Sequence, residues 1–277
     1  MKNKLHLLLT IAVVFSSTLP FHSCTSEETP LSISSESCEI EDLTVILHAG
    51  GGADGLDYLN AQETFELYYS LGYRYFEYDL KLSTDGRLIS SHSGEYLDCA
   101  TPEQLTYEEF KALKLLNGYT PVNEEWLMQT IMEHPDVKIV VDAKMPDVAG
   151  DIAVLNRIET LKSIYNYDLS ANIIPEIFSK EMWECVSKTT TFEQYFFSHY
   201  KVYYSVGMIL DYFDDERIFG VAIPMWSDED FLSQIYRLKE AGKKIFVFTP
   251  LTTQDVATAI SFGADGIYVN TPDILSK

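Results

Sequence analysis

The stretch FEYDLKLSTDGRLISSHS, at residues 76–93, decides the predicted fold. Its first half alternates apolar and polar side chains, as a half-buried strand does, so Glu77 and Asp79 lie on one face about 7 Å apart. A Thr-Asp-Gly turn at 84–86 reverses the chain, and a returning strand at 87–91 brings His92 next to the two carboxylates. The stretch therefore predicts two acids and a histidine gathered together, which suits an ion site beside a group that carries protons.

The rest of the chain alternates short apolar runs with segments of helical periodicity. Strands are predicted at 44–50, 76–83, 138–144, 172–178, 194–200, 218–226, 244–249 and 266–270. Helices are predicted at 60–71, 107–116, 123–134, 147–165, 180–188, 206–213, 228–241 (with Ser227 as its N-cap) and 252–262. Strands that alternate with helices indicate a parallel sheet, and eight such units in one chain predict an α/β fold of the (β/α)8 TIM barrel type.

The first residues predict export and are not expected to belong to the fold. Lysines precede an apolar run at 5–15 that is too short for a comfortable membrane span, which is typical of a signal peptide, here at 1–23. The position of Cys24 resembles the lipobox of bacterial lipoproteins, so Cys24 is predicted to carry a lipid that anchors the protein to the membrane of the cell envelope. Ordinary cleavage with an unmodified cysteine is the alternative. Residues 24–43 predict a flexible tether, and 44–277 the barrel domain.

Composition limits the partners and the cysteine chemistry. A formal net charge of −22 over 277 residues, with no basic stripe, would repel phosphate backbones, so nucleic acid is not an expected partner. Cys38, Cys99 and Cys185 fit no zinc template. A Cys38–Cys99 disulfide is open to an exported protein, but unpaired thiols are the preferred interpretation.

Three acids fall where a barrel of this kind holds its reactive groups, at the carboxyl ends of the strands. Glu77 and Asp79 lie toward the end of the second predicted strand, and Asp142 lies near the end of the third. A single acid at a strand end is usually solvated or ion-paired, but three acids on adjacent strands form an oxygen site. Because Ca²⁺ and Mg²⁺ favour oxygen ligands, Glu77, Asp79 and Asp142 are predicted to bind one of these divalent cations.

Two histidines flank the predicted metal site. His48 ends the first strand and His92 follows the returning strand. Imidazole titrates close to neutral pH, so His48 and His92 are the candidate general acid and base. His199 also follows a strand but has no partner in this arrangement, and it is interpreted as structural.

Lys144 is the candidate cation for an anionic substrate. It ends the third predicted strand, two residues after Asp142. It either contacts a phosphate or acidic ligand, or forms a salt bridge with Asp142 or Glu77, and the sequence leaves both interpretations open.

Short motifs surround these candidate residues. They are 48–50 (HAG), Asn60, 77–79 (EYD), 83–86 (STDG), 92–93 (HS), 142–144 (DAK) and 263–267 (GADGI). Together they resemble the glycerophosphodiester phosphodiesterase family, within the wider phospholipase C-like phosphodiesterase barrels. That family has His-Arg-Gly, Glu-Asn-Thr, Glu-x-Asp, Thr-x-Asp-Gly, His-Asp, Glu-x-Lys and Gly-x-Asp-Gly-Ile at the corresponding places. The agreement is most specific at 77–93.

The resemblance implies a reaction and a role for each residue. His48 and His92 would be acid and base, Glu77 and Asp79 metal ligands, Asp142 the third carboxylate and Lys144 a phosphate contact. The implied reaction is metal-dependent hydrolysis of a small-molecule phosphodiester, glycerol-3-phospho-X, to glycerol-3-phosphate and an alcohol.

The chain also departs from the family pattern. Ala49 stands where the family has an Arg that grips phosphate, Leu59 replaces an acid, and Asp142 is one carbon shorter than the usual Glu. Ser93 and Asn270 replace aspartates. The surviving histidines and carboxylates favour activity with an altered substrate preference. Two alternatives stay open: a barrel lipoprotein that binds its ligand without turnover, and phosphoinositide cleavage that gives a cyclic phosphate.

Overall fold

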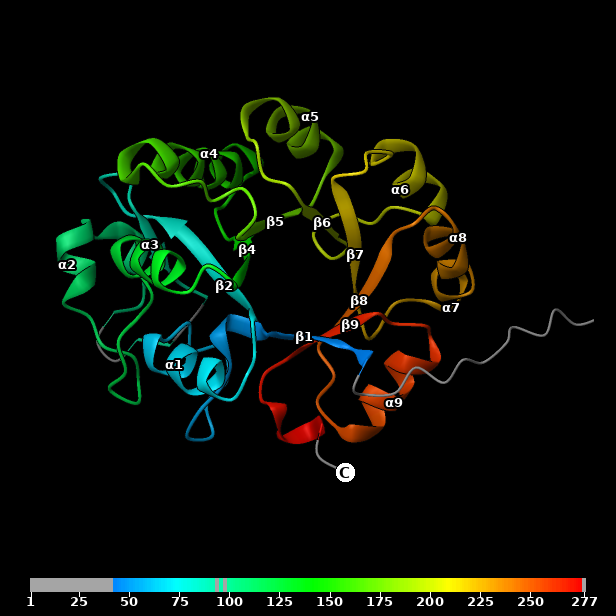
Figure 1. Ribbon diagram of the computed structural model, residues 1–277, viewed down its shortest axis with the longest axis horizontal. Helices are drawn as coiled ribbons and strands as arrows, with labels where there is room; N and C mark the ends of the chain where they lie inside the picture. Colours follow the sequence, from blue (N-terminus) through cyan, green and yellow to red (C-terminus); the bar gives the residue numbers. More distant parts are fainter. Residues whose placement is uncertain (1–41, 93–94, 97–98, 276–277) are drawn as a thin grey trace, which may run out of the picture. The chain divides into compact units, whose positions relative to one another are not determined.

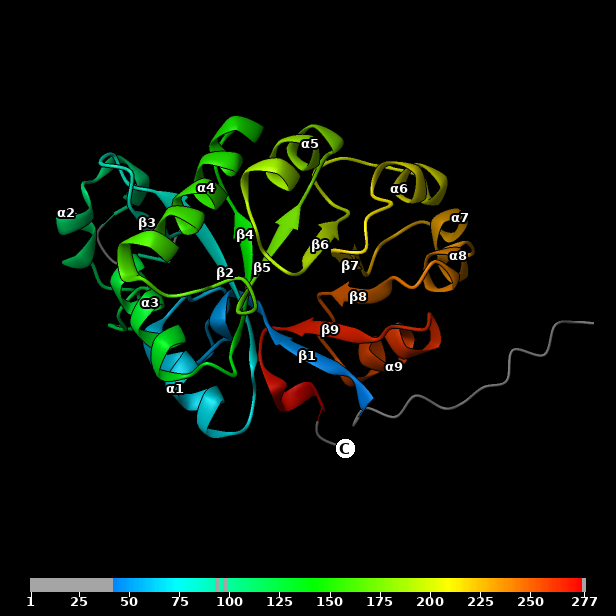
Figure 2. The same ribbon diagram turned by 45° about the horizontal axis from the view of Figure 1, so that its top comes forward.

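The predicted TIM barrel is present in the computed structural model of the protein, which describes residues 42–92, 95–96 and 99–275. Its parallel strands are β1 (Thr44–Leu47), β2 (Tyr75–Leu82), β4 (Lys138–Ala143), β5 (Ile173–Ile177), β6 (Tyr195–Ser198), β7 (Ile218–Pro224), β8 (Lys244–Phe248) and β9 (Gly266–Val269). Each strand pairs with its neighbour in the order β1-β9-β8-β7-β6-β5-β4-β2, and β2 pairs again with β1, so the ring closes (Figure 1, Figure 2).

Inside the barrel, seven strands each contribute one fully buried apolar side chain to a cluster, and three partly buried rings pack against it. The buried side chains are Ile46, Val140, Ile174, Phe196, Ala222, Phe246 and Tyr268, and the rings are Tyr75, Phe219 and Phe248. The large rings fit because glycine faces them: a Cβ at Gly220 would lie 2.9 Å from the Phe196 ring, and one at Gly266 would lie 2.5 Å from the Phe246 ring. On β2 the residue level with Val140 is Glu77. The second strand therefore presents a carboxylate where the other seven present apolar or aromatic side chains.

Helices cover the outside of the ring. They are α1 (Gln62–Ser70), α3 (Glu124–Glu133), α4 (Val148–Tyr165), α5 (Lys180–Thr189), α6 (Val206–Tyr212), α7 (Glu229–Leu232), α8 (Ile235–Glu240) and α9 (Thr253–Ser261). Two 3-10 helices, η2 (His48–Gly50) and η4 (Pro272–Leu275), follow β1 and β9. The outward side chains of the strands pack against them; on β2, Phe76 contacts the ring of Phe65 in α1, and Tyr78 contacts Trp126 in α3.

One hairpin extends the barrel wall. After the turn at Gly86, β3 (Leu88–Ser90) returns antiparallel to β2 and pairs Ser90 with Leu80, as the sequence predicted. The chain then makes an excursion through η3 (Pro102–Gln104) and α2 (Tyr107–Lys111), which lies at the outer edge of the barrel in Figure 1. A small separate apolar cluster holds this excursion against the barrel; it contains Leu59, Ala61, Ile89, Tyr96, Tyr107, Phe110 and Leu115.

A buried carboxylate ties the hairpin to two helices. Glu124, at the start of α3, accepts hydrogen bonds from Arg87 Nε at 2.8 Å, from Arg157 Nε at 2.8 Å and Nη2 at 2.7 Å, and from the backbone N–H of Leu88 at 3.1 Å. Arg157 belongs to α4. The start of β3, and with it the approach to His92, is thereby fixed to α3 and α4.

Two predicted helices were wrong in extent. The segment predicted as one helix at 228–241 is two, because α7 ends at Leu232 and α8 starts at Ile235. Between them the N–H of Gln234 donates to the carbonyl of Phe231, three residues back and not four as in a continuous α-helix. The N-cap of α7 is Asp228, whose carboxylate accepts from the N–H of Phe231 at 2.8 Å, whereas the predicted cap, Ser227, donates to the Pro224 carbonyl. The helix predicted at 107–116 ends at Lys111.

Some predictions fall outside the described residues. The signal peptide, Cys24, Cys38 and most of the tether at 24–43 are among them, as is Ser93. Cys99 and Cys185 are free thiols. Among the residues that the structure describes, no helix has both the length and the apolar character needed to cross a bilayer.

Candidate active site

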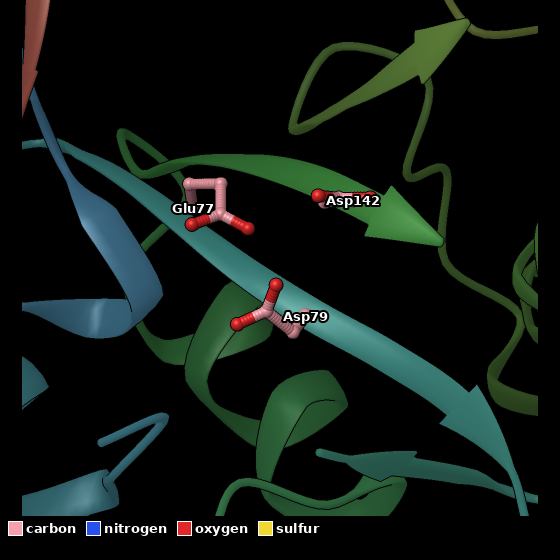
Figure 3. Close-up of side chains that lie close together, drawn as sticks. All are labelled: Glu77, Asp79 and Asp142. Carbon is pink, nitrogen blue, oxygen red and sulfur yellow. The ribbon is translucent and has the colours of Figure 1, made fainter. Parts of the chain in front are cut away.

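The three predicted metal ligands come together inside the barrel. In the parallel register of β2 and β4, Asp79 lies opposite Asp142, and Glu77 precedes Asp79 by two residues on the same face. Each carboxyl group has an oxygen within 4.8 Å of the others (Figure 3). The side chains are buried, with 2%, 0% and 5% of Glu77, Asp79 and Asp142 exposed. The pairing of two strands distant in sequence therefore builds the cluster.

Each of two carboxylates has one oxygen that accepts a hydrogen bond and one that accepts none, and the second oxygen of Asp79 lies 3.3 Å from the Lys144 ammonium. Glu77 Oε2 accepts from the N–H of Ala49 at 2.7 Å, and Asp79 Oδ2 accepts from Asn60 Nδ2 at 2.9 Å. Asn60 is in turn aligned by the N–H of Asp79, which donates to its Oδ1 at 3.0 Å. Glu77 Oε1 and Asp79 Oδ1 have no hydrogen-bond partner among the described residues. Two buried, inward anionic oxygens without such a partner fit a hard divalent cation.

Proximity and burial disfavour the charged state of this cluster when no cation is bound. Burial raises the pKa of Glu77 well above its usual value, and the charges of Asp79 and Asp142 raise it further. Burial also raises the pKa of Asp142, although the Lys144 ammonium opposes the shift. A cation between the three groups would remove this repulsion.

Lys144 pairs with two of the three acids. Its Nζ forms an ion pair with Asp142 Oδ2 and lies 3.3 Å from Asp79 Oδ1, and it donates to the Tyr200 hydroxyl at 3.0 Å. Burial alone would lower the pKa of Lys144, but the charges of Asp142 and Asp79 outweigh burial and raise it, so the ammonium is charged. The predicted salt bridge with Asp142 is present, and the second partner is Asp79 and not Glu77. The phosphate contact stays a prediction.

His48 follows β1 and lies beside the cluster. Its Nδ1 is 3.0 Å from Asn270 Oδ1 and 3.1 Å from Thr249 Oγ1, while Nε2 is 3.9 Å from Glu77 Oε2. Burial lowers the pKa of His48 to about 4, against the opposing charge of Asp79. The ring is therefore neutral near pH 7, and the amide oxygen of Asn270 favours the tautomer with its proton on Nδ1.

A tyrosine lies between the two predicted acid–base histidines. The Tyr58 ring stacks on His92 with 4.8 Å between centroids and 19° between planes, and meets His48 edge-on, also at 4.8 Å. The backbone N–H of His92 donates to Glu95. Tyr58 thus packs against both imidazoles, and no sequence pattern had singled it out, because it lies in a loop and in a left-handed conformation with φ of +56°.

Many of the residues described above line one cavity of about 260 Å³. They include His48, Tyr58, Glu77, His92, Asp142 and Lys144. The other lining residues that bear on the chemistry of the cavity are Glu176, Ser198, Tyr200, Trp226, Thr249 and Tyr268. Lys144 is the only lysine or arginine among the described residues of the lining. An anion that enters this cavity therefore meets one protein ammonium.

Sequence reasoning missed Glu176. It lies on β5, is 4% exposed, and accepts a hydrogen bond from the Tyr268 hydroxyl at 2.7 Å. Burial, and then the charge of Asp142, raises the pKa of Glu176 to about 7. An acid inside the apolar run IIPEI was the signal that could have found it, since its neighbours in that strand are all buried and apolar.

Three predicted departures have structural explanations, and His199 fits its predicted role. Ala49 contributes its backbone N–H to Glu77, and Leu59 is buried in the apolar cluster under α2 and does not line the cavity. Asn270 contacts His48, as given above. His199 is buried, and its Nε2 accepts from the N–H of Tyr204 at 3.1 Å.

Three solved structures with the same fold are at most 20% identical to this chain. A glycerophosphodiester phosphodiesterase from Thermotoga maritima is 20% identical with a TM-score of 0.65, over 84% of this chain and 96% of that one. A phosphodiesterase from Oleispira antarctica, in complex with the product sn-glycerol-3-phosphate, is 17% identical with a TM-score of 0.64, over 83% and 93%. A glycerophosphodiester phosphodiesterase from Parabacteroides distasonis is 17% identical with a TM-score of 0.63, over 83% and 93%.

No sequence among the curated proteins matches this chain significantly. The profile of the family described as "Glycerophosphoryl diester phosphodiesterase family" does match, over residues 48–274, which is nearly the whole barrel. The match starts at His48 and spans the carboxylate cluster, His92 and Lys144. The resemblance and the enzyme class predicted from the sequence, a phosphoric diester hydrolase, are confirmed. The chain therefore belongs to the glycerophosphoryl diester phosphodiesterase family.

Proposed function

We propose that the protein is a metal-dependent glycerophosphodiester phosphodiesterase, which hydrolyses glycerol-3-phospho-X to glycerol-3-phosphate and an alcohol. The observation that carries this proposal is the buried cluster of Glu77, Asp79 and Asp142, of which Glu77 and Asp142 line one cavity with His48 and His92. The glycerol-3-phosphate held by the Oleispira antarctica structure supports the choice of product.

Glu77, Asp79 and Asp142 would hold the metal. Their buried oxygens suit Ca²⁺ or Mg²⁺, and two of them have no hydrogen-bond partner among the described residues. When bound, such a cation screens the charge of phosphate oxygens and lowers the pKa of a hydroxyl or water.

The two histidines would move the protons. His48, neutral and with its Nδ1 proton directed at Asn270, presents Nε2 as an acceptor for the proton of the attacking nucleophile. His92, on the other side of the Tyr58 ring, would protonate the departing alkoxide. Tyr58 keeps the two imidazoles apart and limits their rotation.

Lys144 would contact the phosphate. Its ammonium is held by Asp142 and Asp79, so it sits beside the metal ligands and inside the cavity. Because Ala49 supplies no guanidinium, Lys144 carries the positive charge that the chain itself offers to the substrate.

Release of glycerol-3-phosphate tests this proposal. The full chain, with Ca²⁺ or Mg²⁺ and a panel of glycerophosphodiesters, is compared with His48→Ala and His92→Ala. His134→Ala, a histidine outside the cavity lining, is the matched control. We expect each active-site variant to lose at least about 100-fold in kcat, the usual contribution of a general acid or base, and the control to keep its rate. Equal rates in wild type and both variants would end the catalytic assignment.

A ligand-binding protein without turnover is the second candidate, favoured by the missing Arg at Ala49. Calorimetry with a diester and metal separates the two, because a binding protein would leave the diester intact over hours. A third outcome, a cyclic phosphate detected by phosphorus NMR, would indicate the phosphoinositide-type reaction instead.

We further propose that the protein is exported and anchored to the membrane by a lipid on Cys24, after a signal peptide at 1–23 and before a tether at 24–43. The basic start, the apolar run and the position of the cysteine support this. Metabolic labelling with a radioactive fatty acid should mark the wild type and not Cys24→Ala. Label on both proteins, or on neither, would count against the anchor.

A further inference from the structure

A second hollow adjoins the active-site cavity. It has a volume of about 310 Å³ and is lined by the segments that follow β6 and β7, which pair side by side in the barrel (Figure 2). Tyr200 and Trp226 line both spaces. A molecule whose phosphate occupied the first cavity could therefore extend past these two rings into the second.

The two rings at this boundary differ in their contacts and exposure. Tyr200 is fixed, because its hydroxyl donates to Asp142 at 2.9 Å and accepts from Lys144 at 3.0 Å. Trp226 is 74% exposed and rests edge-on against Phe248, with 6.0 Å between centroids. Tyr203, 62% exposed, adds a third ring to the lining. Three aromatic rings thus surround the hollow.

The described lining of the hollow carries one acidic side chain, Asp228. Asp228 interacts with the Tyr203 hydroxyl, whose pKa is raised by burial and then by the Asp228 charge. Burial lowers the pKa of His199, so that imidazole adds no positive charge near pH 7. No lysine or arginine lines the hollow among the described residues. Aromatic faces with a carboxylate and no cation attract an ammonium group and repel an anion.

We propose that this hollow binds the alcohol part of the diester and selects an ammonium alcohol, of the choline or ethanolamine type. The inference rests on the proposed function, because it takes the reacting phosphate to occupy the adjacent cavity. The rings of Trp226 and Tyr203 would face the cation, and Asp228 would balance its charge. Trp226, Tyr203 and Asp228 are thereby specificity-determining residues.

Competing substrates test the selection. Wild type should have a kcat/KM for glycerophosphocholine at least about tenfold above that for the neutral glycerophosphoglycerol, the factor expected of a partly desolvated cation on aromatic rings. Trp226→Ala, and Asp228→Asn, which keeps a helix-capping side chain, should each bring the ratio toward one. Tyr236→Ala removes an exposed ring on α8 that does not line the hollow, and it should leave the ratio unchanged. Equal kcat/KM values in wild type, or a ratio that survives both variants, would overturn the proposal.

A binding measurement separates this proposal from the proposed function. Trp226 is the most exposed tryptophan of the chain, because Trp183 is buried and Trp126 packs against the core, so the emission change that Trp226→Phe removes reports the hollow. Choline should give a saturable change, and its uncharged carbon isostere, 3,3-dimethylbutan-1-ol, should not. Equal responses to both would overturn the ammonium assignment. Choline binding without hydrolysis of any diester would contradict the proposed function alone, and hydrolysis without choline preference would contradict this inference alone.

Phosphatidylcholine vesicles provide a further arm, since the same ammonium group occurs on a membrane lipid. A response to glycerophosphocholine at concentrations where vesicles give none supports the soluble diester. A response to vesicles alone would overturn the assignment of the hollow to the leaving alcohol.

Discussion

Replacing Glu77 by Gln should raise the melting temperature of the metal-free protein and remove most of its stabilisation by metal. The substitution removes the acid whose ionisation is opposed by burial and by the charges of Asp79 and Asp142, and it keeps the shape of the side chain. The Gln oxygen can still accept from the N–H of Ala49, as Glu77 Oε2 does at 2.7 Å. The new amide group can donate to the carboxylates of Asp79 or Asp142, whose nearest oxygens lie within 4.8 Å.

The size of the effect follows from that spacing. Two unit charges separated by 4.8 Å repel by about 3.5 kcal/mol at an effective dielectric constant of 20. The Lys144 ammonium, paired with Asp142 and Asp79, offsets part of this repulsion. We therefore expect a net gain of roughly 1–3 kcal/mol in the free energy of unfolding, or about 3–9 °C in melting temperature for a domain of this size.

The pH dependence of this stability difference gives a second readout. The pKa of Glu77 is raised in the folded metal-free protein, so the folded state holds its proton more tightly than the unfolded state. The contribution of Glu77 to stability therefore falls as the pH rises above the unfolded value of about 4.3. The advantage of Glu77→Gln over wild type should grow across that range.

Thermal unfolding followed by circular dichroism, with a chelator and then with excess CaCl₂ or MgCl₂, measures both effects. Wild type should gain about 2.7 kcal/mol when the metal is present at 100 times its dissociation constant, and Glu77→Gln much less. Glu181→Gln removes an exposed charge on α5 and serves as the control, with wild-type behaviour expected. A metal-free Glu77→Gln protein that melts below wild type would refute the reasoning, because it would mean that the three carboxylates do not repel one another.

Substitutions at three further positions test other parts of the site and its support. Tyr58→Ala should lower kcat for diester hydrolysis by about tenfold, whereas Tyr58→Phe, which keeps the ring stacked on His92, should stay close to wild type; equal losses in both variants would contradict a role for the ring. Lys144→Ala should raise KM by about tenfold, and Lys144→Arg by less, because a charged donor contributes more than a neutral one to binding an anion; an unchanged KM would remove Lys144 from the substrate contacts. Glu124→Gln should lower the free energy of unfolding by about 2–4 kcal/mol in urea titrations, because it removes the buried carboxylate that pairs with Arg87 and Arg157. A change below about 0.5 kcal/mol would show that these two ion pairs contribute little to stability.

The barrel and half of its site could be predicted because they depend on local pattern. The alternation at 76–83 determines which β2 side chains point inward, and a one-residue slip would have turned Glu77 and Asp79 outward. The position of Asp142 near the end of its strand then sufficed to place it beside them, since parallel strands in a barrel end at the same edge.

The remainder depends on contacts that no local pattern encodes. Tyr58 reaches the histidines through an irregular loop, and Glu176 joins the cavity from a strand whose other side chains read as ordinary core. The start of α7 depends on which of two adjacent polar residues, Ser227 or Asp228, accepts from the first free N–H group. The competing residues have similar intrinsic conformational preferences, so tertiary packing decides between them.

The excursion that carries α2 leaves and rejoins the barrel at two pinned points. Ile89 pairs with Asn123, and Ala61 with Pro121, so the ends of the excursion are held whatever lies between them. Its apolar residues form a cluster of their own, apart from the core under the other helices. The part of this segment around α2 can thus change in length and sequence without disturbing barrel closure or the alignment of β2 with β4. Grafting a longer or differently charged segment between Thr101 and Pro121, which keeps His92 and Glu95 in place, is accordingly a route to new substrate preferences on an unaltered carboxylate cluster.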